Sequence, residues 1–204
     1  MASHRHLNDE LLVAAANAGD SSAMGALLER HYERIRAVCC RIAGDTRDGE
    51  DATQEALLRI VRNLGGFDQR SSFSTWAYRI ATNSALDELR RRQRRPVAVT
   101  PTTDDDREDA APGLSSQIDP LTSAEIERVA DQMMIEDAIR SLSEDHRCVI
   151  VLRDVAGLDY AEVAAVLEIP EGTVKSRLAR ARQDLIVRIR NSEGASQRPK
   201  DIHG

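Results

Sequence analysis

Residues 67–95 read FDQRSSFSTWAYRIATNSALDELRRRQRR, and this stretch organises the rest of the chain. Four of the six aromatic residues of the protein lie in its first twelve positions, and five arginines lie near its end. At 100° per residue, the pattern from Trp76 to Arg95 predicts a helix with two distinct faces. One face is small and apolar and suits a core: Ala77, Tyr78, Ala81, Ala85 and Leu89. The other offers guanidinium and amide groups: Arg79, Asn83, Asp87, Arg90 and Arg94.

The polar face and the aromatic residues before it are typical of an element that binds a DNA strand and holds it open. Arginine and asparagine side chains bind phosphates and base edges, and aromatic rings stack on unpaired bases. The alternative is that the aromatic residues belong to the core and the arginines form a solvated helix end, which the helix dipole also favours. Because basic clusters alone are weak motifs, the choice between these two interpretations depends on the rest of the chain.

Composition favours helices packed on helices: the 204 residues contain few aromatic residues and many alanines and leucines. The formal net charge of −6 argues against a DNA partner only as an average. Residues 96–131 hold two basic and nine acidic residues, whereas residues 1–95 hold 15 basic and 13 acidic ones. Residues 175–190 carry six basic residues and one acid. Both candidate DNA-facing helices are therefore locally basic.

Several other classes of function are disfavoured by the sequence. The apolar runs fall short of the roughly 18 residues that a membrane span needs, and the N-terminus shows no secretory segment, so we expect a cytoplasmic protein without membrane insertion. Cys39, Cys40 and Cys148 fall at positions that helix periodicity assigns to the core. The sequence shows no metal-ligand cluster, phosphate loop or nucleophile–base motif, so we expect no metal, no cofactor and no catalytic residues.

The first half of the chain reads as a helical domain, residues 1–95. Asn8 is a candidate N-cap for a short helix, and apolar residues recur at three- and four-residue steps from Ser21 to Gly44. A third helix is expected from Arg47 to Leu64. Its polar side includes Asp51, Gln54 and Glu55, which spacing alone does not distinguish from an ordinary solvated face.

After Pro96 the character of the chain changes. Residues 96–128 hold four of the six prolines and an acidic block, which predicts a flexible acidic linker. From residue 129 helical patterns resume and extend to residue 190, and the tail 191–204 is predicted to be disordered. The sequence therefore predicts an all-α protein of two small helical domains joined by a tether.

The C-terminal domain carries a helix-turn-helix pattern. Asp159 is a candidate N-cap for the helix YAEVAAVL, the turn Glu168–Pro170 follows, and a last helix opens at Glu171. If the apolar residues of this last helix face the core, Thr173 and several polar residues face outward, as in a helix that enters the major groove. The polar residues in question are Lys175, Ser176 and Arg180, with Arg177 beside the stripe.

Two blocks of sequence resemble one family. They are ED-x-x-QE-x-L-x-R from Glu50 to Arg59, followed by FSTWAYRIA-x-N-x-x-x-D-x-x-RR through Arg91, and the C-terminal S-L-x-x-x-x-R, D-x-x-GLDYAEVA and PEGTVKSRL-x-RAR. In order and separation these motifs closely resemble the extracytoplasmic-function (ECF) group of bacterial RNA polymerase sigma factors, in the sigma-70 superfamily. The resemblance covers about residues 8–190.

The resemblance implies roles for particular residues. Asp51, Gln54 and Glu55 match the helix that docks on the clamp of the polymerase's largest subunit. The part that melts and reads the −10 promoter element matches Phe67, Phe73, Trp76, Arg79, Asn83, Asp87, Arg90 and Arg91. The reader of the −35 element matches Lys175, Ser176, Arg177 and Arg180, with Tyr160 and Thr173 on phosphates.

The resemblance also implies partners: core RNA polymerase, including the flap of its second-largest subunit, and promoter DNA. Family members often respond to an anti-sigma factor, although no residue here identifies one. Two other classes of function stay open from the residues alone. A helix-turn-helix repressor would need neither the acidic face on the third helix nor the aromatic loop, and an enzyme would need a reactive cluster that the motifs do not supply.

Overall fold

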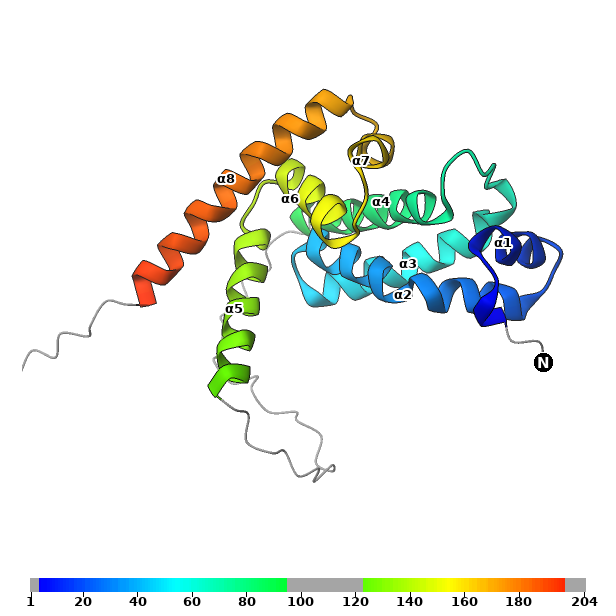
Figure 1. Ribbon diagram of the computed structural model, residues 1–204, viewed down its shortest axis with the longest axis horizontal. Helices are drawn as coiled ribbons and strands as arrows, with labels where there is room; N and C mark the ends of the chain where they lie inside the picture. The colour runs from blue at the N-terminus through cyan, green and yellow to red at the C-terminus, as the bar shows by residue number, and fades with distance from the viewer. Residues whose placement is uncertain (1–3, 95–122, 197–204) are drawn as a thin grey trace, which may run out of the picture.

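The computed structural model describes residues 4–94 and 123–196, and within these ranges every regular element is helical. This confirms the predicted all-α class and its division into two helical domains. Figure 1 shows the N-terminal domain as a bundle and the C-terminal domain as helices set against one side and one end of it. Residues 1–3, 95–122 and 197–204 lie outside the described part of the chain, and with them lies most of the expected linker and tail.

Side-chain caps fix where the N-terminal helices begin. Asn8, Asp20 and Asp45 each accept hydrogen bonds from amide groups in the first turn of the helix that follows, which satisfies donors that a helix start leaves unpaired. The prediction for Asn8 is thus confirmed. After a short 3-10 turn at His4–His6, the helices of this domain are α1 (Asp9–Asn17), α2 (Ser21–Ala43), α3 (Thr46–Asn63) and α4 (Phe73–Arg94).

The core of the N-terminal domain lies where α2, α3 and α4 pack on one another. Leu27, Ile35 and Ile60 are fully buried there, and Tyr78 brings the apolar face of α4 onto them. Four of the five residues of the predicted apolar face of α4 are buried, and the fifth, Leu89, is half-buried. The crossing of α2 and α3 is so close at Gly49 that a Cβ on this residue would lie 2.5 Å from Cys40 Cα.

The C-terminal domain contains the expected helix-turn-helix. Asp159 and Glu162 form a capping box at the start of its first helix, in which each side chain accepts from the backbone N–H of the other residue. Glu168 adopts a left-handed conformation, with φ 55°, and ends that helix. The elements are α5 (Ser123–Arg140), α6 (Glu144–Ile150), a π-helical turn η3 (Val151–Val155), α7 (Tyr160–Leu167) and α8 (Glu171–Ser196).

Two predicted boundaries differ from the structure. Residues 123–128, assigned to the linker from the sequence, already belong to α5, because alanine, glutamate and arginine favour helix once the last proline of the linker has passed. Residues 191–196, assigned to a disordered tail, continue α8. Extending an existing helix adds one hydrogen bond for each residue fixed, so no new nucleus is needed.

The two domains pack against each other, a point that the sequence left open. Their buried apolar residues form one contiguous cluster rather than two. Helix α7 lies against α4 in Figure 1, and α2 contacts α5, α6 and η3. The packing covers one side of α4 and the C-terminal end of α2.

Candidate nucleic-acid and protein interfaces

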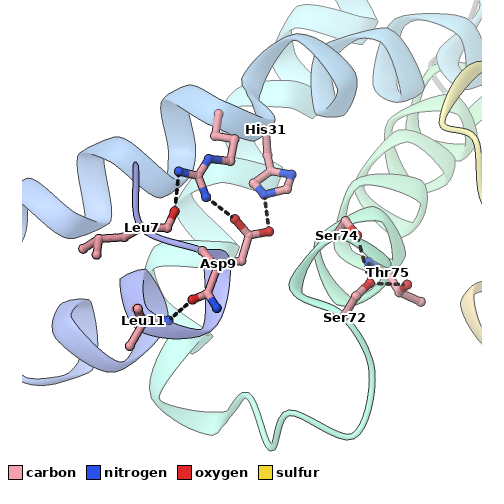
Figure 2. A network of polar contacts seen from close by, with 9 residues as sticks. Leu7, Asp9, Leu11, His31, Ser72, Ser74 and Thr75 are labelled. Carbon is pink, nitrogen blue, oxygen red and sulfur yellow. Dashed lines mark hydrogen bonds and ion pairs between the residues drawn. The ribbon is translucent and has the colours of Figure 1, made fainter. Parts of the chain in front are cut away.

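The loop before α4 is tied to the helix by Ser72. The Oγ atom of Ser72 accepts a hydrogen bond from the backbone N–H of Thr75 at 3.1 Å. The same Oγ lies 2.8 Å from Ser74 Oγ and 2.7 Å from Thr75 Oγ1, as Figure 2 shows. Because a serine in this position caps the helix, α4 begins at Phe73 rather than at Trp76, where periodicity placed its start.

Phe67, before the loop, and Phe73 and Trp76, in the first turn of α4, form an aromatic cluster. The Phe67 and Trp76 ring centroids are 5.2 Å apart, and both rings lie within 6.1 Å of the Phe73 ring. Phe73 is 3% exposed and Phe67 9%, whereas Trp76 is half-buried. This burial corrects the expectation that all of these rings offer a face to unpaired bases: in this conformation Phe67 and Phe73 support the loop, and Trp76 is the aromatic residue at its surface.

A polar network reaches the cluster from α1 and α2. The ring of His31 lies 5.0 Å from the Phe73 ring, and His31 Nε2 is 2.8 Å from Asp9 Oδ2 (Figure 2). The other carboxylate oxygen of Asp9 accepts from Arg30 Nη1 at 2.7 Å, and Arg30 Nη2 donates to Leu7 O. Helix α1 is thereby connected through His31 to the base of the loop.

The polar face of α4 is only partly free. Asn83 and Arg90 are exposed, but Arg79 is half-buried and its Nη2 donates to the backbone oxygen of Ala165 in α7 at 3.1 Å. Asp87 accepts a hydrogen bond from Arg59 of α3 at 3.2 Å. Arg91 Nη1 donates to Glu88 at 2.6 Å. The predicted stripe therefore lies on one face of α4, as expected, but two of its members already have partners outside α4.

A cleft between α3 and α4 joins two sets of residues that the sequence treated separately. Its volume is about 230 Å³. The residues that line it include Asp51, Gln54, Glu55, Leu58 and Arg59 from α3, and Ser84, Asp87, Glu88 and Arg91 from α4. Arg59 links the two helices, because its Nε donates to Glu55 at 2.8 Å while its Nη1 reaches Asp87. The hydrogen bond to Glu55 raises the pKa of Arg59 above its usual value.

Helix α8 presents its first turns as the helix-turn-helix pattern predicts. Val174, Leu178 and Ala181 are buried, whereas Lys175, Ser176 and Arg180 are exposed on the other side. Lys175 Nζ also lies 5.6 Å from the centre of the Tyr160 ring, and Thr173 is half-buried. Arg177 differs from the exposed set, because it is half-buried and its Nη2 is 2.8 Å from Asp145 of α6.

Sequence reasoning missed residues that shape these interfaces. Arg59 belongs to the motif quoted for the third helix, so a signal was present, but its bridge to α4 depends on tertiary structure. Arg147 also lies in a quoted motif; it is buried, and it donates to the backbone oxygens of Leu142 at 3.0 Å and of Ile42, in α2, at 2.9 Å. Burial lowers the pKa of the Arg147 guanidinium below its usual value.

Some classes of site are not present in the described part of the chain. Residues 4–94 and 123–196 contain no group of three or more histidine, cysteine, aspartate and glutamate side chains arranged to hold a metal ion. Within the same ranges no helix combines the length and the apolar character that a membrane span requires. Burial raises the pKa of Cys39 and of Cys148 to about 12, so both thiols stay protonated near neutral pH.

Comparison with known proteins gives matches over both domains. The family model for sigma-70 region 2 matches residues 27–95, and the model for sigma-70 region 4 matches residues 132–185. The chain is 35% identical to the RNA polymerase sigma-H factor of Pseudomonas aeruginosa, over 86% of this chain and 90% of that protein. It is also 35% identical to the ECF RNA polymerase sigma-E factor of Escherichia coli K12, over 87% of this chain and 92% of that protein.

Two solved structures have a similar fold. One is CnrH in complex with the cytosolic domain of CnrY, with a TM-score of 0.62 and 24% identity over 88% of this chain and 95% of that one. The other is the sigma factor RpoE of Bartonella quintana in complex with the anti-sigma factor NepR. It matches with a TM-score of 0.60 and 24% identity, over 80% of this chain and 94% of that one.

Proposed function

This chain belongs to the ECF group of RNA polymerase sigma factors in the sigma-70 family, and we propose that it divides promoter opening among three surfaces. As a sigma factor it is a transcription initiation factor and not an enzyme, and it acts with core RNA polymerase on promoter DNA. The cleft between α3 and α4 docks on the polymerase, the polar face of α4 reads and opens the −10 element, and the start of α8 reads the −35 element.

The docking role of the cleft is supported by its charge and shape. Asp51 and Gln54 are exposed at its edge, and Leu58 adds an exposed apolar side chain. Apolar contact with a polar rim is the usual anatomy of a protein interface. Arg59 bridges Glu55 and Asp87, which favours one arrangement of the acidic surface before a partner arrives.

Asp51→Arg tests the docking role. Because Asp51 is exposed, we expect the free energy of unfolding to stay within about 0.5 kcal/mol of wild type. Affinity for core polymerase is expected to fall at least tenfold. A partner surface that suits an acidic side chain would then face an arginine, and like charges in an interface cost several kcal/mol. Glu29→Arg makes the same charge change at an exposed position of α2 and serves as the control. Equal affinities of the two variants for core in a pull-down would refute the docking role.

The −10 role of α4 is supported by the groups that its surface offers. Asn83 presents an amide, which binds base edges with both a donor and an acceptor, and Arg90 presents a guanidinium for phosphates. Trp76 supplies a half-buried ring in the first turn of the same helix. Phe67 and Phe73 act beneath the surface, where they hold the loop in shape. Extruding a base from the stack costs a few kcal/mol, which stacking and amide contacts offset.

The −35 role of α8 is supported by the exposed side chains at its N-terminal end. Arg180→Ala is expected to cost about 1–3 kcal/mol in promoter affinity at particular upstream bases, because a guanidinium that contacts a base edge discriminates among bases. The check is transcription by reconstituted holoenzyme from promoters that carry single substitutions in the −35 region. A loss that is equal across all upstream sequences would make Arg180 a phosphate contact instead.

The observation that carries the proposed function is that an acidic cleft between α3 and α4, exposed polar side chains on α4 and exposed basic side chains at the start of α8 occur together on one chain with the family's sequence. Its test is transcription with purified core polymerase. We expect core plus this protein to initiate at defined promoters, and sequencing of transcripts made on genomic DNA gives the promoter bases. Transcription no more promoter-dependent than that of core alone would end the proposal.

Two further assignments follow from the same family. We place the protein in the cytoplasm, where bacterial RNA polymerase works. We also propose that an anti-sigma factor controls it, because two proteins of similar fold were solved in complexes, one of them with a named anti-sigma factor. Co-purification of the chain from its own cells, followed by mass spectrometry, is the test. Recovery of polymerase subunits alone would argue against such a partner.

A further inference from the structure

Helix α1 is fixed to α2 through the carboxylate of Asp9. Asp9 is the first residue of α1, where the helix dipole favours a negative charge. Its Oδ1 accepts from Arg30 Nη1 at 2.7 Å, and its Oδ2 lies 2.8 Å from His31 Nε2 (Figure 2). The buried Leu12 and Val13 hold the rest of α1 against the core. The position of this carboxylate is therefore set by both polar and apolar contacts.

The hydrogen bond to Asp9 determines the tautomer of His31. The histidine is 6% exposed, and within the described part of the chain its Nδ1 atom is buried without a hydrogen-bond partner. The Asp9 carboxylate forms an ion pair with Arg30 and can only accept, so Nε2 of the histidine carries the proton. Because a flip of the imidazole would break this bond, Asp9 fixes the orientation of the ring.

The imidazole of His31 is the inner support of the aromatic cluster at the start of α4. Its ring centroid lies 5.0 Å from that of Phe73, and the two planes are inclined at 58°. The Phe73 ring in turn lies 6.1 Å from the Phe67 ring and 5.8 Å from the Trp76 ring. Aromatic pairs attract each other at these distances and depend on mutual orientation. The orientation of His31 therefore affects how Phe73 packs.

Phe67 and Phe73 lie at the two ends of the loop 68–72. Both rings are buried, whereas every residue between them is exposed. Gln69 in this loop is left-handed, with φ 58°, a conformation that a residue with a side chain rarely adopts. Such a conformation persists only where surrounding contacts hold it. The loop therefore depends on its two buried ends, and through Phe73 it depends on His31.

We propose that Asp9 and His31 are positioning residues for the −10 surface: their hydrogen bond holds Phe73, and with it the loop 68–72, in the place where the loop meets the opened DNA strand. His31 is buried and acts through Phe73 rather than on DNA. Helix α1 thus contributes to strand capture from outside the DNA-facing surface. This inference rests on the proposed function, because it assumes the −10 role of α4 and of the loop before it.

Three variants separate the hydrogen bond from the ring contact. His31→Phe keeps a ring against Phe73 but loses the hydrogen bond to Asp9. Asp9→Ala removes the acceptor, whereas Asp9→Asn keeps a neutral amide oxygen for Nε2–H. Val13→Ala and Leu12→Ala are the controls, because they weaken the packing of α1 and leave the pair in place. Urea unfolding gives the loss of stability in each variant, and circular dichroism checks helix content.

Promoter discrimination by the reconstituted holoenzyme is the first measurement. Each promoter carries one substitution in the −10 or the −35 element, and its transcription is compared with that of the parent promoter at saturating sigma factor. We expect discrimination at the most sensitive −10 position to fall at least about fivefold in Asp9→Ala and His31→Phe, because a well-placed base contact contributes that much or more. Asp9→Asn should stay within about twofold of wild type, and so should −35 discrimination in every variant.

The controls decide whether the pair only stabilises the fold. A −10 loss in Val13→Ala or Leu12→Ala as large as that in Asp9→Ala, at a similar loss of stability, would overturn the proposal. Equal losses of −10 and −35 discrimination would overturn it too, and so would an unchanged −10 ratio in Asp9→Ala. If His31→Phe loses its helix content, the comparison of Asp9→Ala with Asp9→Asn decides alone.

A spectroscopic measurement tests the pair without DNA or polymerase. Long-range ¹H–¹⁵N spectra of the full chain at pH 8 distinguish the two imidazole tautomers, and His31→Phe assigns the His31 signals among the five histidines. We expect Nε2–H in wild type and in Asp9→Asn, and a mixture of tautomers in Asp9→Ala. Nδ1–H in wild type would overturn the proposal. If the wild-type holoenzyme showed no promoter-dependent transcription, the proposed function would fail instead, whatever tautomer the spectra show.

Discussion

Arg147→Ala is the substitution for which the structure gives the most specific expectation. The guanidinium is buried and donates to three backbone oxygens, those of Ile42, Arg140 and Leu142. It thereby pairs carbonyls at the C-terminal ends of α2 and α5, two helices that belong to different domains. The left-handed Gly44, with φ 73°, leaves room for it, because a Cβ at that position would lie 2.8 Å from Arg147 Nη1.

The magnitude follows from these contacts. A hydrogen bond from a charged donor contributes about 1.5 kcal/mol or more net of its exchange with water, so three give about 4–5 kcal/mol. Burial of the charge lowers the pKa of the group and offsets part of this contribution. Water reaching the vacated space will satisfy some of the carbonyls. We therefore expect Arg147→Ala to lower the free energy of unfolding by about 2–4 kcal/mol. Arg147→Lys should cost about half as much, because an ammonium lacks the fork that reaches separate acceptors.

Urea unfolding of the full chain measures this effect, and two probes locate it. Trp76 is the only tryptophan and reports on the N-terminal domain, whereas circular dichroism reports on helices of both domains. Because Arg147 of the C-terminal domain pairs a carbonyl of α2, the transition seen by Trp76 fluorescence should move to lower urea. The control is Arg153→Ala, whose Nη1 donates to Leu158 O within its own domain, and which should move that transition less than Arg147→Ala does.

An unchanged Trp76 transition in Arg147→Ala, together with a shift in circular dichroism, would show that the domains unfold independently. That result would refute the coupling inferred from the contact between Arg147 and Ile42.

Three further predictions concern the α2–α3 crossing and the cysteines. Gly49→Ala should lower the free energy of unfolding, measured by heat or urea, by about 1–3 kcal/mol, because its Cβ would overlap Cys40. Gly25→Ala, with open space around it, should instead raise that free energy by about 0.5–1 kcal/mol. Equal effects of the two substitutions would contradict the close crossing. Iodoacetamide at pH 8 should modify half-buried Cys40 before Cys39 and Cys148, whose pKa values are raised to about 12, and mass spectrometry gives the order. From pH 9 to 12 these two thiols ionise in the unfolded chain but stay protonated in the folded one. The free energy of unfolding should therefore fall by about 1.4 kcal/mol per pH unit for each thiol. A pH profile of this free energy that matches the profile of a variant with Cys39 and Cys148 replaced by alanine would contradict their burial.

The helices and their caps were determined locally by the sequence. The three- and four-residue spacing of apolar residues in α2 is a property of neighbours along the chain, and so is the serine or aspartate that begins each of several helices. The motifs that matched the family are local too, so docking and DNA-facing roles could be assigned to residues before any fold was known, and these roles stay predictions. Local pattern was less informative at the start of α5 and at the end of α8, where helix propagation competes with a polar sequence that in α8 contains a glycine.

Only the tertiary structure decided which of these side chains are free. The same aromatic pattern is compatible with rings that face solvent or rings that face the core, and packing against His31 placed Phe73 in the core. Arg79 has the same position on α4 whether or not α7 is present, but α7 determines what its nitrogens bind. Such contacts join residues separated by up to 105 positions in the chain. Their formation depends on how two helical surfaces fit together, and no periodicity within one helix encodes that fit.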